Sequence, residues 1–159
     1  MKTNIDFLTL ILILSVVLTG CSPGKLSLSG DKNALQLRMV DDVKTENNTV
    51  YRGGTDNEAV YVNNNVLMNL TDLEKIKMAQ DDLGRNIFIL TFTTAGAEKM
   101  ASISGNNIGR RLAIIIDGRL ITAPVIRDTI SGGIVQVPLN GAAGEARDLY
   151  KKLHEKQLE

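Results

Sequence analysis

The sequence predicts an α+β domain in which a mostly antiparallel sheet packs with about three helices. Alternating apolar residues at Leu35, Leu37 and Met39 indicate a half-buried strand, and the continuous apolar run Leu112–Ile116 indicates a strand covered on both faces. Asp117-Gly118 is a strong signal for a tight hairpin, which joins antiparallel strands. Segments with helical spacing lie between such strands, an order typical of α+β folds.

Three segments are predicted to be helical. A capping box at 71–74 predicts a helix over 71–80, with Leu73 and Ile76 facing the core. Thr94 is expected to cap a second helix, in which four small or apolar residues recur at helical spacing: Ala97, Met100, Ala101 and Ser104. A C-terminal helix is expected over about 142–157, with four residues in its buried stripe: Ala146, Leu149, Tyr150 and Leu153.

The other strands are predicted from alternation and from turn residues. The polar segment 41–65 is rich in turn signals and holds one short strand at 59–62, and a longer strand covers 87–93. The hairpin returns as 119–126, where Pro124 is expected to interrupt the strand because it has no N–H group. After a Gly-Gly turn, three residues alternate into the core: Val135, Val137 and Leu139.

Composition excludes several classes of protein. The chain has 159 residues and a formal net charge of zero, so it lacks the basic surface that nucleic acids or anionic lipids attract. One Cys and one His exclude a disulfide scaffold and a Cys/His zinc site. The length is sufficient for one domain with its own hydrophobic core.

The N-terminus has the pattern of a lipoprotein signal. Lys2 precedes an apolar run over 7–18, and Leu18-Thr19-Gly20-Cys21 resembles the bacterial lipobox, which is cleaved immediately before its cysteine. The resemblance implies a covalent lipid on Cys21, and no other cofactor is expected. The alternative is an uncleaved signal anchor with an incidental cysteine.

Three regions are therefore expected: a signal peptide over 1–20, a flexible tether over 21–33 and a folded domain over 34–159. The protein is expected in the cell envelope, anchored to a membrane by lipid. In a source with two membranes, Ser22 favours the outer membrane, facing the periplasm, because lipoproteins retained at the inner membrane commonly have Asp at this position.

The polar side chains indicate no catalytic or metal site. The turn explains Asp117, a solvated helix end explains Asp81-Asp82, and Arg110-Arg111 flanks a buried strand. Residues 105–109 are rich in Gly but lack the Lys of a phosphate loop. His154 is expected on the surface of the C-terminal helix. We therefore assign no catalytic, cofactor-binding or metal-ligating residue and expect a protein that is not an enzyme.

Two segments carry a resemblance to a known family. Residues 88–93 read FILTFT and are followed by GAEK at 96–99, while residues 107–126 read NIGRRLAIIIDGRLITAPVI, with a Gly-rich turn at 131–133. The second segment is the more specific. Both resemble the large extracytoplasmic head domain of SecD, a membrane subunit of the SecDF protein-export complex. The resemblance spans nearly all of the domain expected over 34–159.

The resemblance implies a SecD head-like fold that contacts translocating polypeptide and is not a catalytic unit. The expected partners are the membrane, through the lipid, and extended polypeptide or components of the Sec translocase, but not nucleic acid. The contact surface is expected at an exposed sheet edge. The neighbourhood of Pro124 is one candidate, and a second strand supplies four candidate residues: Ile134, Val135, Gln136 and Val137.

Three functional interpretations remain open at this point. The first is a non-enzymatic envelope lipoprotein that binds polypeptide or a partner protein, as an accessory to protein export. The second is a structural or small-ligand-binding lipoprotein that reuses the fold, and an enclosed apolar pocket would favour it. The third is a hydrolase or another enzyme, which would need clustered carboxylates in a cleft.

Overall fold

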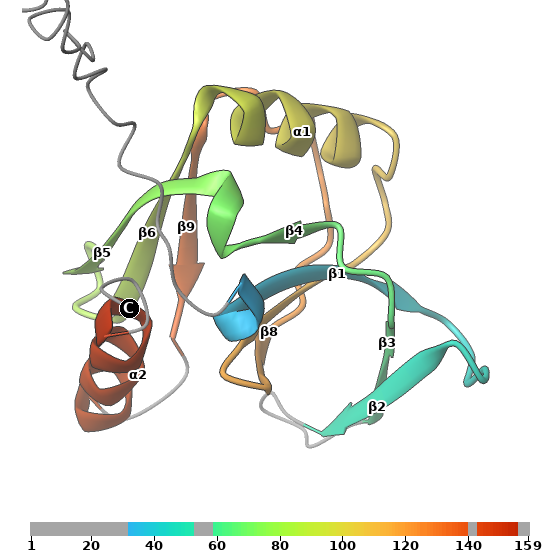
Figure 1. Cartoon of the computed structure of the whole chain (residues 1–159), viewed down its shortest axis with the longest axis horizontal. Helices are drawn as coiled ribbons and strands as arrows, with labels where there is room; N and C mark the ends of the chain where they lie inside the picture. Colours follow the sequence, from blue (N-terminus) through green and yellow to red (C-terminus); the bar gives the residue numbers. More distant parts are fainter. Residues whose placement is uncertain (1–31, 53–58, 140–142, 156–159) are drawn as a thin grey trace, which may run out of the picture.

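The protein forms two antiparallel sheets and two α-helices (Figure 1). The structure is a computed structural model that describes residues 32–52, 59–139 and 143–155. This architecture confirms the predicted α+β class with mostly antiparallel strands.

The larger sheet has six strands in the order β2-β3-β1-β7-β8, and β4 pairs with β1 beside β3. Every pairing in this sheet is antiparallel. β2 and β8 lie at opposite ends of the order and still contact each other, so the sheet curls toward closure (Figure 1). The strands are β1 (Leu35–Asp41), β2 (Asn48–Arg52), β3 (Ala59–Asn63), β4 (Met68–Asn69), β7 (Leu112–Ile116) and β8 (Arg119–Thr122).

The smaller sheet has three strands in the order β5-β6-β9, with β6 in the centre. Its strands are β5 (Leu73–Gln80), β6 (Asn86–Phe92) and β9 (Ile134–Pro138). The two helices are α1 (Thr94–Gly105), which follows β6, and the C-terminal α2 (Ala143–Glu155). Two 3₁₀ turns, η1 (Lys32–Ala34) and η2 (Leu70–Asp72), precede β1 and β5.

β7 is buried on both faces, as its continuous apolar run predicts. Leu112, Ile114 and Ile116 belong to the main hydrophobic core, which also includes residues of β6, α1 and α2. Ala113 and Ile115 belong to a second, smaller core inside the curl of the six-stranded sheet. Because side chains alternate along a strand, β7 forms a wall shared by both cores.

The predicted helix over 71–80 is wrong, because these residues form part of η2 and all of β5. A capping box is present, but it joins Asn69 to Asp72 and opens only the 3₁₀ turn. Leu73 and Ile76 are both buried as predicted, but a β-bulge between Leu73 and Lys75 accounts for their spacing. A bulge adds one residue to a strand, so residues three apart reach the same face, as they do in a helix.

Other elements differ from the prediction in their bounds. β2 lies within the polar segment for which only turns and the strand at 59–62 were predicted. β8 ends at Thr122, before Pro124, and Val125 then forms an isolated bridge with Arg111. This confirms the interruption expected at the proline, which has no N–H for the ladder.

The hairpin and the C-terminal helix agree with the prediction. Asp117 and Gly118 both have positive φ, 50° and 73°, as a type I′ turn requires. Lys152 of α2 lies 2.8 Å from the Asp117 carboxylate and connects the helix to this turn. The predicted stripe is also present, since Ala146, Leu149 and Leu153 are buried and Tyr150 packs against the main core.

Asp81 closes the β5–β6 hairpin. Its carboxylate accepts hydrogen bonds from the backbone N–H groups of Arg85 and Leu83, at 2.8 and 3.0 Å. These bonds, led by that from the Arg85 N–H, hold the pKa of the Asp81 carboxyl below its ordinary value. Asp81 therefore has a turn-forming role, although the turn follows a strand and not the helix end that the sequence predicted.

α1 begins at a close contact with η2. Thr93, one residue before the expected cap Thr94, accepts a hydrogen bond from the Gly96 N–H at 3.0 Å. Gly96 packs against the backbone carbonyl of Asp72, leaving no room for a Cβ atom. Lys99 also contacts Asp72, at 3.2 Å, so helix and turn are held together by backbone and side chain.

We predict that Gly96→Ala destabilises the protein by about 3 kcal/mol, because the added methyl group overlaps the Asp72 carbonyl, which is backbone and cannot rotate away. The matched control is Gly132→Ala, where a Cβ meets nothing within 4 Å. Its effect should stay within about 0.5 kcal/mol. Urea unfolding of the full chain measures both, and equal stabilities of the two variants would contradict the contact.

Candidate functional site

The four predicted edge residues, Ile134, Val135, Gln136 and Val137, all lie in β9. β9 is an outer strand of the three-stranded sheet, and its neighbour is β6 (Figure 1). The pairing is antiparallel, with Phe88 opposite Val137 and Thr91 opposite Ile134. The structure thus brings the candidate residues together on one edge strand.

The hydrogen-bond pattern determines which backbone groups of β9 point away from β6. Phe92 N–H donates to the Gly133 carbonyl and Leu139 N–H donates to the Asn86 carbonyl, both at 2.9 Å. Bonded and non-bonded pairs alternate in an antiparallel ladder, so Val135 and Val137 also bond to β6. The alternate positions, which form the non-hydrogen-bonded pairs with β6, are Ile134, Gln136 and Pro138.

The backbone groups at the alternate positions face the open edge. Ile134 and Gln136 each present one N–H and one C=O there, whereas Pro138 presents only a C=O because it has no N–H. No hydrogen bond joins these groups to another residue within the described part of the chain. They are therefore available to an added strand.

The side chains of β9 divide between core and surface. Val137 is 1% exposed and packs in the main core, while Ile134 is 54% exposed. Gln136 and Pro138 are also exposed. A strand added at this edge would therefore meet the exposed side chains of Ile134, Gln136 and Pro138, and none of them carries a charge.

The other sheet edges are protected in different ways. β5, the opposite edge of the same sheet, carries exposed Glu74, Lys75 and Lys77, and such charges oppose edge-to-edge pairing. In the larger sheet, the end strands β2 and β8 contact each other. Of the two outer strands described in the smaller sheet, β9 is thus the one without charged side chains.

The second candidate edge, around Pro124, belongs to the larger sheet. The Pro124 carbonyl accepts a hydrogen bond from the Leu112 N–H at 3.0 Å, and Val125 bridges Arg111. Val125 is 47% exposed. The backbone around Pro124 is therefore already partly paired, and it has fewer free hydrogen-bonding groups than β9 to offer an added strand.

The remaining polar residues considered from sequence are not gathered into one site. Arg111 donates through Nε to the Ala123 carbonyl at 2.9 Å, which is a structural bond. Cys21 and the side chain of His154 lie outside the described residues. Within the described residues, no three His, Cys, Asp or Glu side chains lie close enough to hold a metal ion together. No helix in this same part has the length and apolarity to cross a bilayer.

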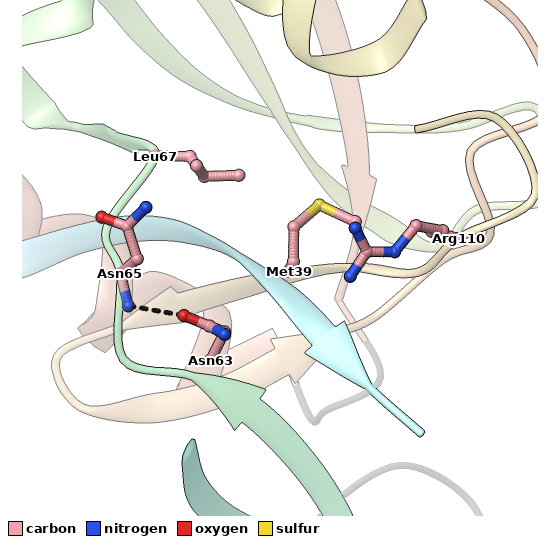
Figure 2. A pocket seen from close by; sticks show the side chains of 5 residues that line it. All are labelled: Met39, Asn63, Asn65, Leu67 and Arg110. Atoms are coloured by element: carbon pink, nitrogen blue, oxygen red, sulfur yellow. Dashed lines mark hydrogen bonds between the residues drawn. The ribbon is translucent and has the colours of Figure 1, made fainter. Parts of the chain in front are cut away.

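A small cavity beside β1 was not predicted from the sequence (Figure 2). Its volume is about 150 Å³, and five side chains line it: Met39, Asn63, Asn65, Leu67 and Arg110. Most small-molecule sites have about 300–1,000 Å³. The sequence had indicated Met39 as a strand residue and Arg110 as a residue flanking a buried strand, and neither as part of a cavity. The lining residues come from three separate segments, so no local pattern marks them.

Comparison with known proteins supports one family. The model of the family described as "SecDF, P1 head subdomain" matches residues 46–159. The protein translocase subunit SecDF of Thermus thermophilus is 41% identical over 83 residues, covering 52% of this chain and 11% of that protein. The translocase subunit SecD of Aquifex aeolicus is 31% identical over 130 residues, covering 76% of this chain and 26% of that protein.

Solved structures agree with the sequence matches. A structure described as that of "a membrane component SecDF that enhances protein export" is 28% identical, with a TM-score of 0.59 over 75% of this chain and 60% of that one. SecDF in a super-membrane-facing form is 27% identical, with a TM-score of 0.60 over 81% of this chain and 19% of that one.

The chain spans about a tenth to a quarter of the length of these curated relatives. The match to the family model covers most of the chain, including β2 to β9 and both helices. The protein therefore belongs to the SecDF P1 head subdomain family.

Proposed function

We propose that this protein is an envelope lipoprotein whose SecD head-like domain binds extended polypeptide at the open edge of β9, without catalysis and as an accessory to protein export. The observation that carries the proposal is the free backbone of Ile134 and Gln136 on an uncharged edge strand. The names of the relatives, translocase subunits, support a role in export.

Binding through the edge would be weak and tolerant of sequence. Each backbone hydrogen bond contributes about 1 kcal/mol net, and association costs several kcal/mol. Backbone groups are the same in every polypeptide, so the edge selects for extended conformation more than for side chains. Such contacts suit a transient hold on a chain that moves past.

The lipid anchor would keep the domain near the membrane surface. In this proposal the mature chain begins at Cys21, which carries the lipid, and the tether runs to residue 33. Residues 32 and 33 belong to η1, and the remaining eleven would reach at most about 40 Å if fully extended. Two or three acyl chains give stable anchoring, whereas one gives only marginal binding.

The small-ligand alternative has less support. It calls for an enclosed apolar pocket, but the cavity of Figure 2 has about 150 Å³ and is lined partly by Asn and Arg side chains. A protein that stores or carries a small molecule needs more volume than this to bury its ligand. Polypeptide binding is therefore the function that the described geometry supports best.

We predict that Gln136→Pro weakens binding of an extended peptide about fivefold, because it removes one outward N–H from the edge. The ladder with β6 should remain, since the Gln136 N–H does not point toward β6. Fluorescence anisotropy of a labelled peptide of alternating Thr and Val measures the affinity. Gln136→Ala keeps the N–H and is the matched control.

The two Gln136 variants distinguish backbone from side-chain binding. Gln136→Ala should bind as the wild type does, and both variants should unfold at similar urea concentrations. Wild-type affinity in a folded Gln136→Pro variant would contradict binding at this edge. A loss shared equally by both variants would show that the side chain, and not the backbone, makes the contact.

We also predict that Cys21→Ser abolishes lipid attachment, because the serine hydroxyl does not replace the thiol that accepts the diacylglycerol. Cells fed an alkyne-bearing fatty acid should label the wild-type protein and the control Ser22→Ala, but not Cys21→Ser. The label is the decisive readout, since an unprocessed signal can itself hold a chain at the membrane. Labelling of the Cys21→Ser variant, or absence of label from the wild-type protein, would contradict the proposed lipid anchor. Membrane fractionation of the labelled wild-type protein then identifies which membrane it occupies.

A further inference from the structure

The cavity beside β1 has a size that fits one apolar side chain. Its volume is about 150 Å³, and a cavity of about this volume holds a benzene-sized group. It lies between Met39 of β1, the β3–β4 connection and Arg110 of the α1–β7 loop (Figure 2). The space is partly open and has both polar and apolar lining, and its volume is large enough to receive a Leu or Phe side chain of a bound polypeptide.

Met39 and Leu67 supply the apolar walls. Met39 is 7% exposed and belongs to the main core, and Leu67 packs against that core while remaining partly exposed. Leu67 points toward Met39 across the cavity (Figure 2). Because a Met side chain is flexible and polarisable, this wall can adapt to apolar groups of different shape.

Arg110 supplies hydrogen-bond donors at the rim. Its Nη1 donates to Asn107 Oδ1 at 2.9 Å, but its Nη2 lies 3.8 Å from Asp41 Oδ1, too far for a hydrogen bond. The guanidinium carries five N–H groups, so donors remain for a ligand. The side chain is 51% exposed and lines the cavity together with Met39 (Figure 2).

Asn63 and Asn65 complete the polar lining of the cavity, and they differ in whether their carboxamides already make hydrogen bonds. Both polar atoms of the Asn63 carboxamide already make a hydrogen bond, since its Nδ2 donates to Asp41 at 3.2 Å and its Oδ1 accepts from the Asn65 N–H at 2.9 Å. The carboxamide of Asn65 has no hydrogen bond to the described residues and is exposed. It can donate to a peptide carbonyl or accept from a peptide N–H.

The local charge favours a neutral ligand. Asp41 is held by Asn48 and Asn63, and its carboxylate partly neutralises Arg110. A carboxylate near Arg110 would also be repelled by Asp41, which offsets part of its attraction to the guanidinium. A peptide carbonyl carries no net charge and is an acceptor for the Arg110 and Asn65 donors.

Two exposed apolar residues lie close in sequence to Asp41 and Arg110. Val43 is 65% exposed and lies two residues after Asp41, and Ile108 is 55% exposed and lies two residues before Arg110. Two residues span at most about 7 Å of chain, so both lie near the Asp41–Arg110 pair. Neither residue lines the cavity itself.

From these contacts we infer that the cavity is a second binding site, which holds one uncharged apolar side chain of an extended polypeptide while Arg110 and Asn65 bind its peptide carbonyl. The inference rests on the proposed polypeptide binding, but it uses a different surface from the edge of β9. A chain held at two points would be retained longer than one held at the edge alone.

The test uses the full chain labelled with ¹³C on its methionine methyl groups. A Gly/Ser peptide with one central Phe should shift the Met39 methyl resonance saturably, whereas the buried Met68 and Met100 should not move. The same peptide with Asp in place of Phe should bind about tenfold more weakly. Arg110→Leu should also lose about tenfold, because it removes a charged donor.

Arg119→Leu is the matched control, since Arg119 is exposed on β8 and makes no contact with the cavity. It should bind the Phe peptide as the wild type does. A peptide that binds by anisotropy and is sensitive to Gln136→Pro, but leaves Met39 unshifted, would overturn this second site and leave the edge proposal standing. A Met39 shift without any effect of Gln136→Pro would support the cavity and count against the edge. Absence of any binding would overturn both.

Discussion

The burial of β7 on both faces is the constraint on which the rest of the structure depends. Its five residues divide between two hydrophobic cores, three on one side and two on the other. Each buried aliphatic side chain contributes about 2 kcal/mol relative to exposure, so both faces must be covered. The curl of the six-stranded sheet covers one face, and β6, α1 and α2 contribute to the core on the other. The smaller sheet is thereby placed against the larger one, with β9 left as an outer strand.

That placement explains where a polypeptide could bind. The larger sheet brings its end strands β2 and β8 into contact, and β5 carries charges that oppose pairing. β9 has neither protection, although Pro138 removes one donor at its end. The fold therefore supplies an open edge to which a strand can be added, and this binding needs no catalytic group. The chain belongs to the SecDF P1 head subdomain family, and one solved relative is described as a membrane component that enhances protein export.

The elements whose patterns lie in neighbouring residues were predicted correctly from the sequence. Features that depend on contacts between distant segments were not. The run Leu112–Ile116 and the Asp117-Gly118 turn were predicted correctly because burial on two faces and positive φ each leave a signature in neighbouring residues. β5 was misassigned as a helix because its bulge gives Leu73 and Ile76 a helical spacing. The β9 edge was located correctly, but its binding role stays a prediction. The cavity could not be predicted, because Met39, Asn65 and Arg110 meet only through the pairing of β1 with its neighbours.

Amide hydrogen exchange at β9 tests the central claim most directly, since it reports on single backbone N–H groups. In the free protein, the outward amides of Ile134 and Gln136 should exchange faster than those of Val135 and Val137, which bond to β6. A saturating alternating Thr/Val peptide should slow exchange at Ile134 and Gln136 by about tenfold or more and leave Val135 and Val137 unchanged. Unchanged exchange at Ile134 and Gln136 while the peptide is bound would contradict the account.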